Sequence, residues 1–278
     1  MSAITECRSC GTSDLFPILS LGNQYPSNFV DEGFSPNEKD KIPLELVLCG
    51  KKECGLLQLK HMASRESLYK RYWFRSGLNE TMRKALQDIT ESIEKRITLS
   101  QYDIVLDIGC NDGTLLRSYQ SNVQLVGFEP ASNLIDEAKH GTTKIINDFF
   151  LLDEFEKHFP NEKCKAITSI AMFYDLEDPN SFVTDIVNCL DQSGIWVIQM
   201  AYLIPMLEQN AFDNIVHEHL QYYSLKSLKN LLESHGLEIF DVELNDVYGG
   251  SFRVFVKNKK NDQIQIQNSV NELLTKEE

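Results

Sequence analysis

The chain of 278 residues has no long apolar run and comparatively little positive charge. A membrane-spanning helix needs about 20 consecutive apolar residues, and no stretch comes close to that length, so we expect no membrane segment. The first residues, Met1 to Glu6, lack the basic region and apolar core of a secretion signal, which favours a cytoplasmic protein. Lys and Arg number 27 against 41 Asp and Glu, and this net charge of −14 argues against nucleic acid as the main partner.

The composition is typical of a globular protein, with 42% hydrophobic and 24% charged residues. The length accommodates one large domain and a small one. We expect a cysteine-containing lobe over residues 1–60, a helical connector over 61–100, a sheet domain over 101–258 and a polar tail over 259–278. The end of that tail, Asn268 to Glu278, has a helical pattern but no evident surface to pack against.

The most informative segment is the turn Asp107-Ile108-Gly109-Cys110-Asn111-Asp112-Gly113, which follows a short apolar strand. A strand, an acidic residue, a glycine-rich turn and a helix are how α/β folds hold nucleotide-like cofactors. The spacing D-x-G-x-x-x-G differs from the dinucleotide pattern and resembles the first motif of class I S-adenosylmethionine-dependent methyltransferases. That resemblance implies that Asp107 meets the cofactor's ammonium group, directly or through water. It also implies that Gly109 and Gly113, with Asn111 between them, let the backbone approach the methionine part.

Three later strands end in residues placed to bind the rest of such a cofactor. The second strand ends at Glu129, about 20 residues beyond the turn, where an acid accepts both ribose hydroxyls. The third ends at Asp148, well placed for the adenine amino group, and the fourth ends at Ala171, the last cofactor-binding candidate. The ordered series therefore strengthens the assignment of the turn to a cofactor site.

Strands that alternate with helices predict an α/β fold: a seven-stranded, mostly parallel sheet with helices on both faces. We expect strands at 104–106, 124–129, 144–147, 165–170, 194–200, 237–244 and 250–256, the last two antiparallel. We expect helices at 61–98, 114–119, 131–139, 179–190 and 224–235. Asp178 and Pro179 are typical of a helix start, and Gly236 is typical of a helix end.

Seven cysteines without a secretion signal indicate reduced thiols. Four of them form two close pairs, Cys7 with Cys10 and Cys49 with Cys54, and such pairs can close a tetrahedral zinc site. The alternative is four buried or incidental cysteines. A lobe with so little core would draw much of its folding free energy from the metal. The other three cysteines, at 110, 164 and 189, are expected to fill apolar core positions.

The segment between the fifth strand and the next helix contains the residue types that usually transfer protons, namely His217, Glu218, His219, Tyr222 and Tyr223. In an extended chain the two histidines would face one side, and in a helix they would diverge, so we expect one of them to face the cofactor. The alternative is a pair of loop histidines held by backbone carbonyls. The spacing is not H-E-x-x-H, so a catalytic zinc is not implied.

A second cluster, Tyr72-Trp73-Phe74-Arg75-Ser76-Gly77, lies between the cysteine lobe and the sheet domain. Its aromatic residues and Arg75 could cap the cofactor or clamp a carbonyl or phosphate, or they could only join the two lobes. The paired glycines in Tyr248 to Arg253 permit either close approach of a ligand or a plain hairpin turn.

Taken in order, these motifs resemble the nucleotide-sugar C-methyltransferases. The resemblance rests on Cys7-Arg8-Ser9-Cys10-Gly11, Arg75-Ser76-Gly77, the turn Asp107 to Gly113, His217-Glu218-His219-Leu220 and Gly249-Gly250-Ser251-Phe252-Arg253. It implies a structural Zn²⁺ on the four paired cysteines, S-adenosylmethionine as cofactor and a nucleotide-linked ketosugar as small-molecule substrate. It also implies that His219, supported by Glu218, removes a proton beside the ketone.

The chain departs from the family pattern at two places that handle protons. Many relatives have a tyrosine where Val216 stands and a histidine where Tyr174-Asp175 stands. Tyr174, Tyr222 and Tyr223 are the candidates to take over, and Tyr72 and Arg75 complete the expected substrate contacts. Relatives also continue into a third, Rossmann-like domain, so either the chain is cut or its substrate is smaller. We expect residues 1–278 to bind the cofactor and to hold a nucleotide-sugar weakly.

Two rival functions stay open at this point. One is O-methylation of a small molecule, with His219 taking a proton from a hydroxyl group. The other is a non-catalytic scaffold whose zinc lobe docks a partner while the sheet domain retains the cofactor. The sequence does not specify the sugar, its ring carbon, the nucleotide or the oligomeric state.

Overall fold

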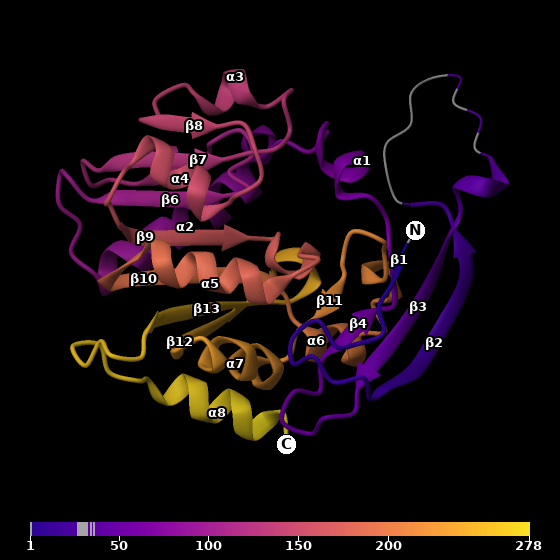
Figure 1. Ribbon diagram of the computed structural model, residues 1–278. Helices are drawn as coiled ribbons and strands as arrows, with labels where there is room; N and C mark the ends of the chain where they lie inside the picture. Colours follow the sequence, from indigo (N-terminus) through magenta and orange to yellow (C-terminus); the bar gives the residue numbers. More distant parts are fainter. Residues whose placement is uncertain (1, 27–32, 34, 36) are drawn as a thin grey trace.

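The computed structural model describes residues 2–26, 33, 35 and 37–278, and its centre is a seven-stranded sheet (Figure 1). Its strands are β6 (Ile104–Ile108), β7 (Gln124–Phe128), β8 (Lys144–Ile146), β9 (Cys164–Ile170), β10 (Leu190–Ala201), β12 (Leu237–Asn245) and β13 (Ser251–Asn258). The order across the sheet is β12-β13-β10-β9-β6-β7-β8. All neighbours from β10 to β8 are parallel, and β13 is antiparallel to β10 and β12, which confirms the predicted α/β class and mostly parallel sheet.

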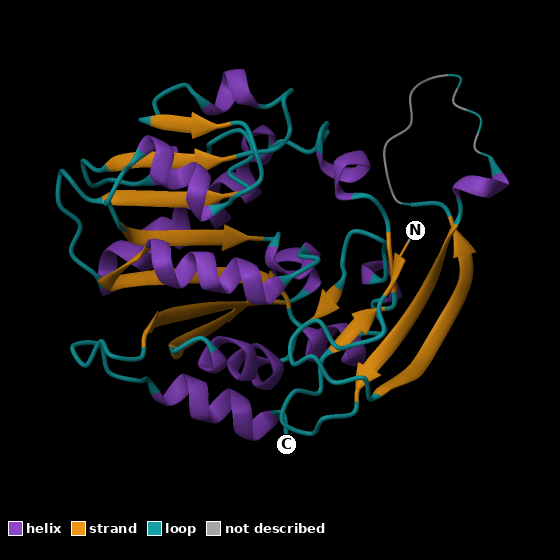
Figure 2. Ribbon diagram, in the orientation of Figure 1, coloured by secondary structure: helices purple, strands orange, loops and turns teal. Residues whose placement is uncertain are grey.

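Helices cover both faces of this sheet (Figure 2). They are α1 (Arg65–Tyr69), α2 (Glu80–Arg96), α3 (Ile135–Ala138), α4 (Leu152–His158), α5 (Pro179–Cys189), α6 (Leu203–Glu208), α7 (Leu225–Ser234) and α8 (Asn268–Lys276). α4, α5, α7 and α8 bury Phe155, Ile186, Leu228 and Leu273 on one face, and α2 buries Ile89 on the other. Within the described ranges, no helix combines the length and apolar character required to cross a bilayer.

The cysteine region forms a smaller sheet at the side to which the parallel strands point (Figure 1). Its strands are β2 (Leu15–Gln24), β3 (Ile42–Cys49), β4 (Leu57–Leu59) and β11 (Gln221–Tyr222), in the order β11-β4-β3-β2, and β1 (Ser2–Ala3) pairs separately with β5 (His61–Met62). β11 comes from the segment that carries the histidines. A strand from the far end of the chain therefore completes the small sheet and ties it to the large one.

Three predicted helices are shorter than expected because side chains satisfy the backbone instead. Between α1 and α2, the N–H groups of Tyr72, Ser76 and Gly77 donate to Asn133, Asn111 and Asp112. The region 61–98 therefore consists of β5, the helices α1 and α2, and between these helices an irregular segment that ends in a 3₁₀ turn, Ser76–Leu78. The predicted helix at 114–119 is one 3₁₀ turn, Leu116–Ser118, because the next N–H groups donate to Glu94. The predicted helix at 131–139 is reduced to α3.

The expectation that the C-terminal helix has nothing to pack against is wrong. Val270 and Leu273 of α8 are buried in the main core, where the helix contacts β12 and α7. Beyond α8, the carboxylate of Glu277 accepts hydrogen bonds from the N–H groups of Leu225 and Lys226 at 2.6 and 2.9 Å and from the Tyr202 hydroxyl at 2.8 Å. The residue thus caps the start of α7.

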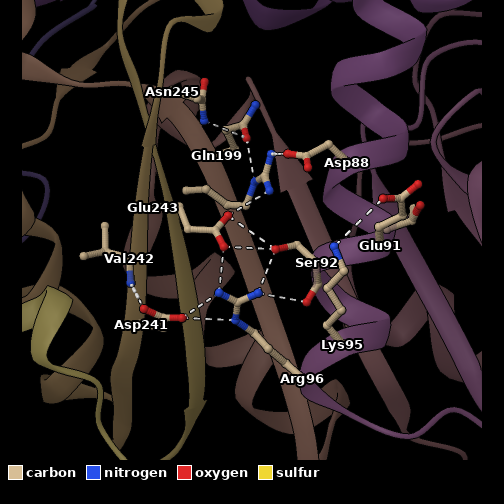
Figure 3. A network of polar contacts seen from close by, with 12 residues as sticks. Asp88, Glu91, Ser92, Lys95, Arg96, Gln199, Asp241, Val242, Glu243 and Asn245 are labelled. Carbon is tan, nitrogen blue, oxygen red and sulfur yellow. Dashed lines mark hydrogen bonds and ion pairs between the residues drawn. The ribbon is translucent and has the colours of Figure 1, made fainter.

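A partly buried polar network fixes α2 to β12 and β13 (Figure 3). Arg253, which is only 3% exposed, donates to Gln199 at 2.8 Å, Glu243 at 2.9 Å and Asp88 at 2.8 Å. Arg96 donates to Asp241 at 2.6 Å and to Glu243 at 2.7 Å. Shared carboxylates give each guanidinium several partners, so the network resists sliding of α2 across the sheet.

Candidate functional site

A cavity of about 580 Å³ lies at the carboxyl ends of β6, β7, β8 and β9. Open α/β sheets usually bind their ligands at this edge. The lining includes five of the predicted cofactor-binding residues, namely Gly109, Asn111, Glu129, Asp148 and Ala171. The structure therefore gathers around one cavity residues that the sequence places on four separate strand ends.

The two glycines of the turn have different roles. Gly109 lines the cavity in a left-handed conformation, with φ of 75°, and its N–H donates to the carbonyl of Phe128 at 2.9 Å. Gly113 is not among the lining residues. A Cβ atom there would lie 3.0 Å from the backbone oxygen of Ala138, so Gly113 permits close packing of the turn against α3 rather than contact with a ligand.

Two buried acids flank the turn at different depths. Glu129 lines the cavity and accepts hydrogen bonds from the N–H groups of Asn111 at 2.7 Å and Ala131 at 2.8 Å, while burial raises its pKa to about 6. Asp107 lies below the lining residues and accepts a hydrogen bond from the Thr168 hydroxyl at 2.6 Å. Burial raises the pKa of Asp107 to about 7. A water-mediated contact with a ligand fits this depth better than a direct one.

The segment from Tyr72 to Gly77 forms one wall of the cavity. Tyr72, Phe74 and Ser76 are lining residues. The Asn111 side chain accepts from the N–H of Ser76 and donates to the carbonyl of Phe74, both at 3.0 Å, while Asp112 accepts from the N–H of Gly77 at 2.7 Å. Sequence reasoning missed Asp112 as the residue that fixes this wall, although an Asp inside a glycine-rich turn is typical of side-chain-to-backbone bonding.

Three predicted site residues lie away from the cavity. The exposed Arg75 pairs with Glu137 of α3 at 3.1 Å, because opposite charges meet there at the surface. Tyr223 is fully buried in the main core, and its hydroxyl donates to Gln221 at 3.0 Å. His217 is buried with Nε2 3.1 Å from the carbonyl of Ile42, so it faces the small sheet. None of these three residues is thus placed to contact a ligand in the cavity.

His219 lies beside a second, small cavity of about 10 Å³, together with Tyr174 and Tyr222. The ring centres of Tyr174 and His219 are 4.3 Å apart. His219 Nδ1 lies 3.0 Å from the carbonyl of Asn214, which only accepts, so Nδ1 carries the proton and Nε2 keeps a lone pair. Burial lowers the pKa of His219 to about 4, and the imidazole is therefore neutral, as a proton acceptor must be.

Glu218 is half-buried, and burial raises the pKa of its carboxyl group. Its backbone carbonyl accepts a hydrogen bond from the Tyr69 hydroxyl at 3.5 Å. Among the described residues no hydrogen bond joins the Glu218 carboxyl group to His219. The proposed support of the histidine by this acid therefore remains a prediction.

The four paired cysteines converge on one point. Their sulfur atoms all lie within 4.8 Å of one another, with Cys7 and Cys54 at 3.8 Å and Cys10 and Cys49 at 3.6 Å. A tetrahedral Zn²⁺ with Zn–S bonds of about 2.3 Å separates its sulfur ligands by about 3.8 Å. Hydrogen bonds, chiefly from Cys54, lower the pKa of Cys7 to about 4, so one thiolate is favoured before any metal arrives. Geometry and donor set fit zinc.

Comparisons with known proteins agree with this geometry. The methyltransferase domain family matches residues 74–242, more than half of the chain, and a putative zinc binding domain family matches residues 7–69. The C-methyltransferase NovU of Streptomyces niveus is 28% identical over 277 residues, which are 99% of this chain and 65% of that protein. The chain thus spans about two thirds of the length of this curated relative.

Solved structures share the fold at low sequence identity. The magnesium protoporphyrin IX methyltransferase from Synechocystis PCC 6803, with SAH bound, has a TM-score of 0.50 and 11% identity, over 66% of this chain and 89% of that one. The mycolic acid cyclopropane synthase CmaA1 has a TM-score of 0.50 and 13% identity, over 70% of this chain and 91% of that one.

The sheet order, the cavity at the strand ends and the sulfur cluster define a class I methyltransferase fold with an N-terminal zinc site. The chain belongs to the methyltransferase domain family. The predicted cofactors, S-adenosylmethionine and zinc, agree with both family matches. The residues of the cavity fit the first of them, because a glycine-supported turn and two strand-end carboxyl groups line a space large enough for a nucleoside.

Proposed function

We propose that this chain transfers a methyl group from S-adenosylmethionine to a ring carbon next to the carbonyl group of a nucleotide-linked ketosugar. The observation that supports the proposal most strongly is a single cavity lined by Gly109, Glu129 and Asp148 and, on another side, by the segment that begins at Tyr72. The 28% identity to a C-methyltransferase supports attack by carbon rather than by oxygen. The residues in contact with the cofactor and substrate are parts of the same proposal.

We assign the following cofactor contacts to residues in and below the cavity. Glu129 accepts the ribose hydroxyls through lone pairs that its two backbone donors leave free. Asp148, exposed at the rim, accepts from the adenine amino group. Asp107 attracts the ammonium group through water, and Gly109 and Asn111 position the methionine part. When bound, S-adenosylmethionine supplies a methyl group on a positively charged sulfur.

The chain itself has to make the nucleophile. A carbon attacks only after it loses a proton beside a carbonyl group, and His219 is proposed to accept that proton on Nε2. The imidazole packs against the ring of Tyr174, with 4.3 Å between ring centres, and the neighbouring Asp175 lines the cavity. Tyr222 borders the same small cavity as His219 and completes the proton-handling set. If the sugar carbon, the methyl group and the sulfur are held in line, the carbon can displace the sulfur from the methyl group.

The charge of the cavity lining indicates which part of the substrate enters. Seven carboxyl groups and one guanidinium line it, from Glu66, Glu129, Asp148, Asp175, Glu177, Asp178, Asp185 and Arg65. Such a lining favours a positively charged donor and an uncharged sugar ring and disfavours a diphosphate. We propose that the sugar ring enters and the diphosphate stays outside, so that residues 1–278 hold a nucleotide-sugar weakly.

The direct test is methyl transfer to a panel of nucleoside-diphosphate ketosugars that differ in nucleotide and sugar. We expect a product whose new methyl group is on a ring carbon, located by mass spectrometry and NMR. A methyl group on oxygen would replace this proposal by O-methylation. Cofactor binding without turnover of any panel member would favour the scaffold.

A pair of histidine variants tests the assigned base. His219→Gln should lower turnover by about 10²–10⁴-fold while S-adenosylhomocysteine still binds normally in calorimetry, because the imidazole lies outside the cofactor cavity. His158→Gln, on the surface of α4, is the matched control and should behave like the wild type. Undiminished turnover in His219→Gln would show that another group takes the proton.

A further inference from the structure

Asp175 is a cavity carboxyl group that the proposed proton transfer does not use. It ends the 3₁₀ turn Phe173–Asp175, directly after β9, and lines the cavity next to Ala171 and Met172. Its N–H donates to the carbonyl of Met172 at 3.0 Å, which fixes its position. Its Oδ1 atom is buried and has no hydrogen-bond partner among the described residues. An unsatisfied buried oxygen is costly, so its presence in a cavity indicates a ligand.

The surroundings of Asp175 favour its neutral form. Tyr69 of α1 lies close to its carboxyl group and donates its hydroxyl hydrogen to the backbone carbonyl of Glu218 at 3.5 Å, while the acid of Glu218 lies close enough to raise the pKa of Asp175. The phenols of Tyr72 and Tyr222 are also close enough to interact with it electrostatically, and among the described residues no Lys, Arg or His contributes to the shift of its pKa. Burial and the neighbouring Glu218 raise its pKa well above the ordinary value.

We propose that Asp175 is a catalytic residue of this methyl transfer and that its carboxyl group holds the carbonyl oxygen of the substrate through a hydrogen bond from Oδ1. The inference rests on the proposed function. The C–H proton passes to His219, the C–H electron pair becomes a C=C bond, and the carbonyl π pair moves to the oxygen. Asp175 binds that oxygen most strongly when its negative charge has developed. The carbonyl group re-forms as the carbon takes the methyl group and the C–S electron pair returns to sulfur.

Two features make Asp175 suitable for this role. A carboxylic acid kept neutral by an apolar, acid-rich surrounding donates a hydrogen bond at neutral pH, whereas a carboxylate only accepts. Its position on the turn after β9 places Asp175 among the residues that line the cavity assigned to the methyl donor. Preorganised donors of this kind are worth about 10²–10³-fold in rate.

The test separates the proton step from methyl transfer. Protein saturated with S-adenosylhomocysteine is mixed with a ketosugar nucleotide in D₂O, and uptake of deuterium at the carbon beside the ketone is followed by mass spectrometry. Asp175→Ala should slow this exchange by about 10²–10³-fold with cofactor affinity unchanged. Asp175→Asn, whose amide still donates, should retain an intermediate rate. Glu156→Gln, an exposed acid of α4 that is not among the residues lining the cavity, is the matched control and should exchange at the wild-type rate.

A second measurement needs no sugar substrate. Infrared difference spectra of wild type against Asp175→Asn, with S-adenosylhomocysteine bound, should show a protonated carboxyl group at pH 7 that titrates only at higher pH. A carboxylate at pH 7, or undiminished deuterium exchange in Asp175→Ala, would overturn the assignment. If the wild type neither exchanges nor methylates any ketosugar, the proposed function fails and the role of Asp175 in it fails too. The infrared result still reports separately whether Asp175 carries the proton.

Discussion

At the scale of single residues, three buried acids at the site have no Lys or Arg partner among the described residues. Asp107, Glu129 and Asp175 are each shifted to a higher pKa mainly by burial, and every charged neighbour that adds to the shift is itself an acid. Burying acids without opposite charges beside them costs free energy and does not by itself stabilise the fold. A positively charged ligand such as a sulfonium offsets this cost, so the electrostatics of the chain match the cofactor to which the turn points.

The pH dependence of stability tests the burial of Asp107. Its folded pKa of about 7 exceeds the ordinary 3.8, so the folded state holds more protons between these values and stability falls as pH rises through that window. Asp107→Asn removes the buried charge. We expect the free energy of unfolding in urea to rise by about 1–3 kcal/mol at pH 8 relative to wild type, with the difference vanishing toward pH 4.

The control for this titration is Asp262→Asn, an exposed acid on the loop before α8. It should change the free energy of unfolding by less than about 0.5 kcal/mol at every pH. An equal effect of Asp107→Asn at pH 4 and pH 8 would show that lost packing, and not the buried charge, causes the change.

Residues whose roles depend on local chain geometry could be predicted, and residues whose roles depend on distant packing could not. Gly109 and Glu129 follow directly from a strand and the turn or residue after it. Which way His217 and Tyr223 face depends on β11, a two-residue strand that pairs with β4 across more than 160 positions. Nothing in the local pattern encodes that pairing, so their predicted contact with ligand had no physical basis in the sequence.

At the scale of elements, capping residues explain both the successes and the failures. α5 begins where Asp178 caps it and Pro179 fills its first position, as predicted. The helix predicted from Ser224 is α7, which begins at Leu225 with Ser224 as its N-cap, but a second cap on it comes from Glu277, beyond α8. The sequence shows a local cap through its spacing. A cap supplied from 50 residues away is visible only once the fold brings both ends together.

Glu277 therefore gives the sharpest test of how α8 is attached. Glu277→Ala removes the acceptor of two helix N–H groups and of the Tyr202 hydroxyl, and should lower the free energy of unfolding by about 1–2 kcal/mol. Glu278→Ala, the exposed neighbour, is the matched control and should be neutral. Denaturant unfolding monitored by circular dichroism measures both variants. Equal stabilities would show that α8 is held by its apolar side chains alone.

At the scale of the whole molecule, the zinc region and the large sheet share one core. Cys7, Cys49 and Cys54 pack in the same apolar cluster as Trp196 of β10 and the fully buried Tyr223. Asn180 of α5 also donates to the carbonyl of Arg8 at 2.7 Å. The boundary predicted at residue 60 thus divides two stretches of sequence whose side chains pack in the same core. The periodicity of apolar residues could not show this, because it does not tell which surfaces pack against each other.

Zinc removal should consequently destabilise more than the cysteine region. Cys54→Ser is expected to lose the metal, because one ligand of four is replaced, and to lower the midpoint of thermal unfolding reported by the fluorescence of Trp196. Zinc content by mass spectrometry and the unfolding curve are measured on the same sample. Cys189→Ala, a buried cysteine outside the cluster, should keep one zinc per chain despite the small cavity it creates. If zinc-free Cys54→Ser unfolds at the same midpoint by Trp196 fluorescence, the large sheet folds independently of the metal. The core that the two sheets share would then contribute little to the stability of the large sheet.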